Sequence, residues 1–168
     1  DVISGGVIID NSLDEYIELK NITNAPVKLY DPAYPTNTWQ IKGGIGFRFP
    51  TNITIAATSA VLLVNFDPGT NLTQLAAFRS KYGVPTNIHV FGPYSGKLNN
   101  STDTLELYKP DPVQLAPHPD AGFVPSILVE KLKYEDSGPW PAGADNTGQA
   151  LQRISHTGYA NDNTNWFA

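Results

Sequence analysis

Short apolar segments separated by turn-forming residues run along almost the whole chain of 168 residues. Fourteen glycines and fourteen prolines divide the sequence, and only 16 % of its residues are charged. Segments of this length with alternating or β-branched side chains are typical of strands, because successive side chains of a strand point to opposite faces. Roughly nine or ten such strands joined by turns predict an all-β fold, and specifically a β-sandwich.

The expected strands differ in how their apolar residues are arranged. In Asp14–Lys20, Ile17 and Leu19 alternate with polar side chains, which predicts a strand with one buried face. The continuously apolar Ala60–Val64 indicates a strand covered on both faces. The other segments with a strand pattern are Val7–Ile9, Val27–Leu29, Trp39–Ile41, Phe47–Phe49, His89–Phe91, Thr104–Tyr108, Ser126–Tyr134 and Leu151–Ile154.

A long proline-rich loop from Lys109 to Pro125 precedes the strand segment Ser126–Tyr134. Alternation along this segment predicts that Leu128 lies on the same face as Glu130 and Leu132.

One segment, about residues 72–82, has the pattern of a helix. Its apolar residues recur at helical spacing, and Asn71 with Gln74 three residues later has the spacing of a capping box. Gly83 and Pro85 follow, and these residue types end helices. We therefore expect one short helix inserted in the β-fold.

Composition and charge exclude several classes of partner. The net charge is −5 with no cluster of lysine or arginine, whereas nucleic-acid and anionic-membrane binding need a basic surface. The longest apolar run, near Ala56–Phe66, is far shorter than the roughly 20 residues of a membrane span. Cysteine is absent, which removes thiol nucleophiles, cysteine-based metal sites and disulfides. We expect no nucleic-acid partner, no membrane insertion and no cofactor.

Several motifs occur in a fixed order along the chain. They are Asp14–Asn21, Gly43–Phe47 with Phe49-Pro50, Val64–Phe66, Phe78–Gly83, Phe91–Leu98, Thr104–Leu107, Pro139–Pro141, Gly148, Leu151, Arg153-Ile154 and Asn161–Trp166.

With these motifs the chain resembles the lamin tail domain family, in the form found in exported bacterial proteins. The resemblance covers nearly the whole sequence and implies an immunoglobulin-like β-sandwich without an inter-sheet disulfide, outside the cell or at its surface. The helix and the Phe91–Leu98 loop look like features of the bacterial branch. Coiled-coil heptads are absent, so a filament-forming role is not implied. We expect a single domain over residues 1–168, excised from a larger protein.

No motif predicts catalysis. Gly92–Gly96 is similar to the nucleophile elbow of hydrolases, but two residues instead of one separate the first glycine from Ser95. The glycine-rich Gly43–Gly46 precedes a strand pattern, whereas a phosphate cradle precedes a helix, so a turn is favoured. The three histidines are dispersed and do not have the spacing of a metal site.

Two carboxylates and one arginine have structural interpretations. Glu15 and Glu18 face opposite sides of one strand, so we expect them to bond neighbouring loop amides instead of sharing an acid–base site. Arg153 is expected to form an ion pair with Asp145 or Glu135.

Candidate binding residues lie in loops. Trp140 could pack in the core or form a platform for a sugar ring. The candidate ligand-binding residues are Tyr94, Trp140, Asp145 and Asn146. Oxygen ligands in the C-terminal loops form a weak calcium candidate, against which ordinary turn hydrogen bonding is favoured; its carboxylates are Asp136, Asp145 and Asp162.

The sequence therefore predicts an extracellular, non-catalytic module that binds or adheres to a protein or a glycan. The alternative is a structural accessory domain that positions a catalytic domain elsewhere in the parent chain. A hydrolase in its own right is the weakest of the three hypotheses, because no nucleophile–base pattern supports it.

Overall fold

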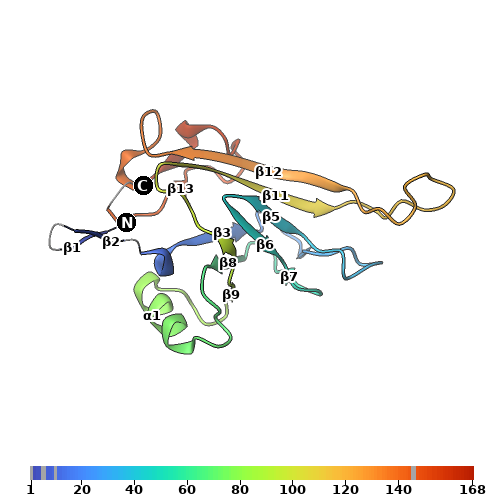
Figure 1. Cartoon of the computed structure of the whole chain (residues 1–168), viewed down its shortest axis with the longest axis horizontal. Coiled ribbons are helices and arrows are strands. Elements are labelled where there is room, and N and C mark those ends of the chain that lie inside the picture. Colours follow the sequence, from blue (N-terminus) through green and yellow to red (C-terminus); the bar gives the residue numbers. More distant parts are fainter. Residues whose placement is uncertain (1, 5–6, 10, 145–146) are drawn as a thin grey trace.

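Two β-sheets lie one over the other, and a helix covers the outer face of the smaller sheet (Figure 1). The computed structural model describes residues 2–4, 7–9, 11–144 and 147–168, with the side chains described from residue 11 onward. No helix in these ranges is long and apolar enough to span a membrane.

The larger sheet has five strands, and all its neighbouring pairs are antiparallel. In spatial order they are β10 (Ser95–Gly96), β6 (Ile45–Arg48), β5 (Gln40–Gly43), β11 (Thr102–Pro110) and β12 (Ser126–Glu135).

The smaller sheet has three strands: β3 (Tyr16–Lys20), β8 (Ala60–Val64) and β9 (His89–Phe91). β8 pairs with β3 in the antiparallel direction and with β9 in the parallel direction. Three two-stranded ladders complete the described strands. They are β1 (Val2–Ser4) with β2 (Val7–Ile9), β4 (Val27–Lys28) with β7 (Thr54–Ile55), and β13 (Gln152–Arg153) with β14 (Trp166–Phe167).

β8 is covered on both faces, as its continuous apolar sequence predicts. Val61 and Leu63 point into the core between the sheets, where Ile41 of β5 and Ile45 of β6 are also buried. The alternate residues of β8, Leu62 and Val64, pack instead against α1 and its neighbours. A strand can be apolar throughout because each of its faces meets a different layer.

The helix α1 spans Leu72–Tyr82, the range expected from the sequence. The side chain of Asn71 accepts the N–H of Gln74 at 3.2 Å, and Gly83 ends the helix with a left-handed φ of 62°. Phe78 is the residue through which the helix is most deeply buried, with 1 % of its surface exposed.

A β-bulge corrects the predicted facing of Leu128. Leu107 of β11 lies opposite Glu130, but the next residue, Tyr108, lies opposite Leu128, so Val129 is inserted without a partner. An inserted residue reverses the alternation of the strand beyond it. Leu128 therefore leaves the face shared by Glu130 and Leu132, a shift that the sequence pattern alone does not reveal.

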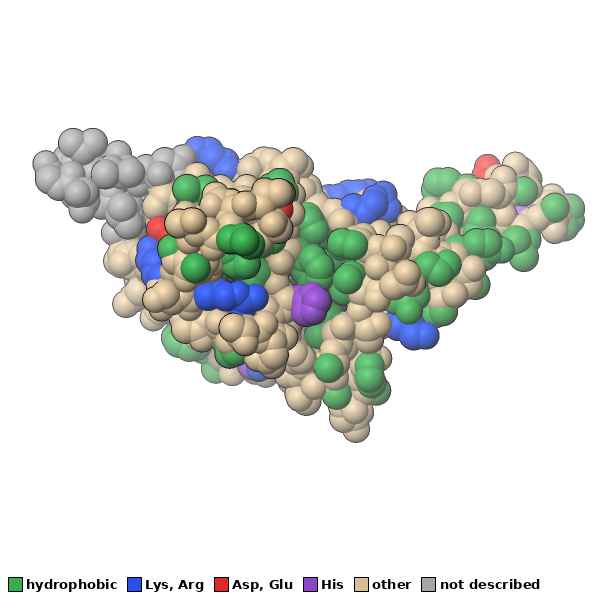
Figure 2. Space-filling view, turned by 90° about the horizontal axis from the view of Figure 1, so that it is seen from below, with side chains coloured by type: hydrophobic (Ala, Val, Ile, Leu, Met, Phe, Trp, Pro, Cys, Tyr) green, Lys and Arg blue, Asp and Glu red, His purple; other side chains and the backbone are tan. Residues whose placement is uncertain are grey.

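The far ends of β11 and β12 extend beyond the other strands and carry the proline-rich loop at their tip (Figure 1). The loop continues the ribbon through backbone hydrogen bonds, such as Asp111 N–H to the Pro125 carbonyl. Apolar side chains gather along this projecting end (Figure 2). Those with large exposed surface in this region are Leu115, Phe123, Ile127, Leu128 and Val129.

The expectation of an all-β chain with one short helix is confirmed for the described residues. Gly43–Gly46 forms the turn and adjoining strand ends between β5 and β6, as predicted. Four strands of two or three residues were not predicted; they are β1, β7, β10 and β14.

Candidate binding groove

A half-open groove of about 1350 Å³ lies between the edge of the small sheet and the inner face of the large one. One wall is β3, every residue of which lines the groove. The opposite wall is the inner face of β11 and β12, and the C-terminal segment contributes the third side. A concave space that combines apolar and polar side chains is the usual form of a ligand site.

The wall formed by β3 exposes an unpaired strand edge. Among the described strands, β8 is the only one that pairs with β3. Asn21 donates its N–H to the carbonyl of Ser59, its opposite residue, at 2.8 Å. In an antiparallel pair, every second residue directs its backbone groups toward the partner strand. The backbone N–H and C=O groups of Ile17 and Leu19 therefore face β8. The backbone groups of Tyr16, Glu18 and Lys20 point away from β8, toward the free edge.

Apolar side chains cover the floor of the groove. Leu105 and Leu107 project from β11, and Leu132 lies opposite Leu105 on β12. From the other sheet, Ile17 and Leu19 face the same space and pack against the core. These residues are partly buried: they contact the core on one side and remain accessible from the groove on the other.

At one end of the groove, Glu15 joins three segments of the chain. Its Oε2 accepts the hydroxyl of Tyr94 at 3.1 Å and the backbone N–H of Leu98 at 3.2 Å. The sequence-based expectation that Glu15 bonds a loop amide is thus confirmed. Burial of Tyr94, reinforced by the negative charge of Glu15, raises the pKa of its hydroxyl well above the ordinary value of 10.0.

Tyr134 lines the same end from β12. Its hydroxyl donates a hydrogen bond of 2.7 Å to the carbonyl of Asn99. Burial, then the nearby carboxylates of Asp103 and Glu15, raise the pKa of Tyr134. Both tyrosines of this end are therefore neutral hydrogen-bond donors at physiological pH, which suits them to structure and not to proton transfer.

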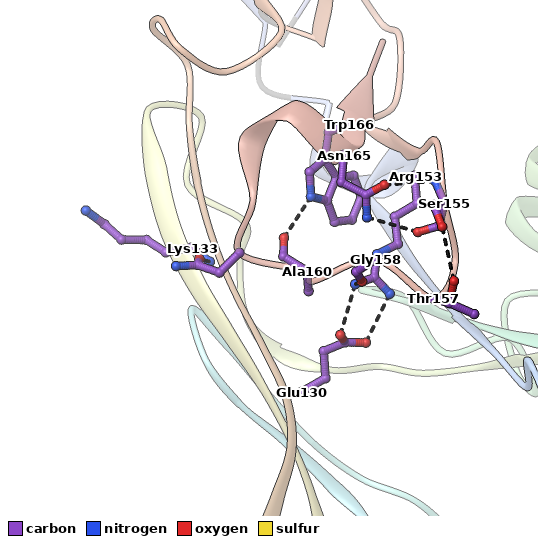
Figure 3. A network of polar contacts seen from close by, with 10 residues as sticks. Glu130, Lys133, Arg153, Ser155, Thr157, Gly158, Ala160, Asn165 and Trp166 are labelled. Carbon is purple, nitrogen blue, oxygen red and sulfur yellow. Dashed lines mark hydrogen bonds and ion pairs between the residues drawn. The ribbon is translucent and has the colours of Figure 1, made fainter.

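A network centred on Arg153 attaches the C-terminal segment to β12 (Figure 3). The guanidinium forms two hydrogen bonds with the carboxylate of Glu130, at 2.9 and 3.1 Å. It also donates to the carbonyl of Gly158 at 3.2 Å and lies over the ring of Trp166, 5.4 Å from its centroid. The prediction that Arg153 pairs with Glu135 is wrong, because Glu135 forms an ion pair with Lys133. The other expected partner, Asp145, lies outside the described residues.

Side-chain amides complete the attachment. The N–H of Lys133 on the outer edge of β12 donates to Asn161 Oδ1 at 2.7 Å. Asn165 accepts the N–H of Ser155 and donates to the carbonyl of the same residue, and the indole N–H of Trp166 bonds the carbonyl of Ala160 (Figure 3). The C-terminal segment thus closes part of the edge of β12, while within the described ranges no strand pairs with the outer edge of β3.

The described lining of the groove is acidic. Its basic residues are Lys20 and Arg153, and Arg153 is already neutralised by Glu130. Its acidic residues are Asp14, Glu15, Glu18, Glu130, Glu135 and Asp136. The carboxylates outnumber the cations, and four of them lie at the end lined by Tyr134, which favours a ligand with positive charge at that end of the groove.

Two of the four candidate ligand-binding residues predicted from the sequence are described, and both are buried. Tyr94 is 4 % exposed and Trp140 is 8 % exposed. Trp140 contacts the ring of Trp166 with centroids 6.2 Å apart, which favours packing over a sugar platform. The remaining two candidates, Asp145 and Asn146, lie outside the described residues.

Two residues of the calcium candidate are described, and each has a local hydrogen bond, through the carboxylate in Asp162 and through the backbone in Asp136. Asp162 accepts the N–H and hydroxyl of Thr164 at 3.0 and 2.7 Å, the turn bonding favoured from the sequence. Thr164 lowers the pKa of Asp162 through these bonds. Asp136 donates its backbone N–H to Ser101. Within the described ranges, no group of three or more His, Asp or Glu side chains is placed to hold a metal.

The sequence did not reveal the groove as a site, because the strand residues of its walls have the pattern of ordinary strands. Ile17, Leu19 and Leu132 have the alternation of a core face, and the pattern gives no sign that part of this face remains uncovered. A mismatch in strand number between two sheets is a tertiary property.

No family model, curated protein or solved structure matches the chain.

Proposed function

We propose that this chain is a non-catalytic, extracellular binding module that holds a protein or glycan in the groove beside β3. The observation that carries the proposal is the combination of an apolar floor with an unpaired strand edge in one concavity. Such a surface offers both apolar contact and a row of backbone hydrogen-bonding groups. The resemblance to lamin tail domains of exported bacterial proteins supports the extracellular setting and an immunoglobulin-like form of the sandwich.

The electrostatics of the groove support binding over catalysis. Tyr94, buried beside the groove, and Tyr134, which lines it, have raised pKa values and bond to Glu15 and to a backbone carbonyl. A hydroxyl nucleophile needs an adjacent base that can take its proton near neutral pH. Glu15 already accepts two hydrogen bonds as a carboxylate, which is the arrangement of a structural anchor.

A retention assay tests the proposal. The purified chain is passed over immobilised bacterial cell-wall polymers, host glycans and extracellular-matrix proteins. Leu132→Ser, on the groove floor, is expected to reduce retention at least tenfold. Leu128→Ser is the matched control, because Leu128 lies on the same strand but is 47 % exposed on the other face. Lack of retention on every surface, or equal retention by both variants, contradicts the proposal.

The alternative role is that of an accessory domain that positions a catalytic domain of the parent chain. It predicts no retention by the isolated chain and a loss of parent activity when the chain is deleted.

A further inference from the structure

The groove lies where the smaller sheet lacks a strand. The inference drawn from this geometry rests on the function proposed above. The five-stranded sheet faces a sheet of three strands, and β3 is the strand at which the smaller sheet stops. Beyond it, the inner-face residues Leu105, Leu107 and Leu132 line open groove instead of meeting another strand. One more strand beside β3 would cover them.

We propose that the groove accepts an extended peptide segment of a partner protein, which adds to β3 as a fourth strand of the smaller sheet. The N–H and C=O groups of Tyr16, Glu18 and Lys20 point toward this position. Addition of a strand to an exposed edge is an established mode of peptide recognition, in which backbone bonds give affinity and alternate side chains give specificity. β3 has five residues, which spans about 17 Å of extended chain.

The floor defines the side chains that the segment carries. Side chains that point from the added strand toward the large sheet meet Leu105, Leu107 and Leu132. Alternate residues point the other way, to the face that Tyr16, Glu18 and Lys20 occupy. The favoured segment therefore has an apolar residue at every second position.

The charges define one end of the segment. Asp14 and Glu15 precede β3 at the end of the groove where β12 finishes with Glu135 and is followed by Asp136. Lys81 neutralises Asp14 and Lys133 neutralises Glu135, whereas among the described residues Asp136 has no ion pair. In antiparallel addition the C-terminal end of the segment lies beside the start of β3, so a lysine or arginine there complements this lining, and the affinity falls as salt screens the charges.

The proposal is tested with the blocked heptapeptide Lys-Val-Thr-Val-Thr-Val-Lys. Binding is followed by tryptophan fluorescence, since Trp39 and Trp166 line the groove, and by calorimetry. We expect saturable binding that weakens at least tenfold when both lysines are replaced by glutamates. No binding at millimolar peptide, or equal binding of both peptides, overturns the proposal.

Two N-methylated peptides test the backbone ladder. Methylation removes an N–H donor, so it weakens binding only at residues whose N–H faces β3. In antiparallel addition, the residues opposite Tyr16, Glu18 and Lys20 bond β3, and the intervening residues face the apolar floor. Methylation of the threonines is therefore expected to abolish binding, and methylation of the central valine to leave it within threefold. Equal effects of the two modifications exclude strand addition.

One protein variant isolates the edge. Glu18→Pro removes an N–H that points away from β8, so the β3–β8 ladder keeps all its bonds. Glu18→Ala is the matched control, because it removes the same charge and retains the N–H. We expect both variants to unfold within a few degrees of each other, with peptide affinity at least tenfold lower for Glu18→Pro. Equal affinity in the two folded variants overturns the proposal.

These outcomes separate the inference from the broader function. If the peptide fails but the chain is retained on a glycan or protein surface through Leu132, the binding function stands and strand addition does not. The groove could instead hold a segment of the chain itself. In that case the peptide would not bind, and Glu18→Pro would be less stable than Glu18→Ala.

Discussion

Arg153 and Glu130 form a two-point ion pair that joins the C-terminal segment to the inner face of β12, with N–O distances of 2.9 and 3.1 Å. The arginine side chain is 17 % exposed and the glutamate 44 % exposed, so the pair lies at the boundary between solvent and protein. Glu130 lies opposite Leu107 on the groove side of β12, where Arg153 balances its charge. The pair both attaches the segment and neutralises a charge at the groove wall.

Loss of this pair is expected to lower stability. Arg153→Met should reduce the free energy of unfolding by about 1 to 2 kcal/mol, because it removes the charged hydrogen bonds and leaves Glu130 without its cation. Urea denaturation measures the difference. Lys133→Met, which removes the more exposed pair with Glu135, should change it by less than about 0.5 kcal/mol. A smaller effect at Arg153 than at Lys133 would contradict the assigned role.

The raised pKa of Tyr94 predicts a loss of stability in alkali. Above pH 10.0 the tyrosine ionises in the unfolded chain but stays protonated in the folded one, so the folded state binds more protons and stability falls as pH rises. Below pH 10.0 this contribution is fully present. Tyr94→Phe should weaken the fall in Tm between pH 9 and pH 11. An unchanged slope would show that Tyr94 does not cause it.

Asn21 is a buried amide whose removal should lower the free energy of unfolding. Its Nδ2 lies within 2.8 to 3.2 Å of the carbonyls of Ala25, Ile55 and Ala56. Its Oδ1 accepts the N–H and hydroxyl of Thr23. Asn21→Ala should lower the free energy of unfolding by about 2 to 3 kcal/mol, because buried carbonyls lose their donor. Thermal and urea unfolding test this; the exposed Asn100→Ala serves as the control and should have little effect.

Trp140 should be a packing residue. Trp140→Ala is expected to lower the free energy of unfolding by about 3 kcal/mol, since a large buried side chain leaves a cavity. Trp140→Phe should recover part of that loss. A stable Trp140→Ala variant that no longer binds its ligand would instead place Trp140 in a recognition site.

Gly43 should tolerate no side chain. Its φ is +113°, and an added Cβ would lie 1.9 Å from the carbonyl oxygen of Thr104 on the paired strand. Gly43→Ala should therefore cost about 3 kcal/mol or prevent folding. Gly138→Ala is the control, because nothing lies within 4 Å of a Cβ at that position. Equal Tm values for the two variants would contradict the strained geometry.

Local patterns sufficed where one segment determines its own structure. The range of α1 follows from the cap at Asn71, the apolar spacing and the glycine at 83. The alternation of β3 correctly separated Ile17 and Leu19 from Tyr16, and the predicted bond to a loop amide is found at Glu15. For the helix and for the facing of β3, the decisive interactions span a few residues or one strand period.

Longer-range features did not follow from the sequence. The bulge at Val129 depends on the pairing of β12 with β11, and it reversed the facing of Leu128. The partner of Arg153 is Glu130, which lies 23 residues away in the sequence, on β12. Tyr94 and Trp140 lie in loops by sequence and are buried in space.

The sequence by itself determined most of the strands, the helix and the absence of thiol chemistry, because these depend on residue type and local periodicity. Tertiary structure decided which apolar residues are covered. Ile17 and Leu105 have the same core-like pattern as Val61 and Ile41, but they line the groove because the small sheet stops at β3. Burial depends on how many strands each sheet contains and where its edge falls, and no single segment encodes that.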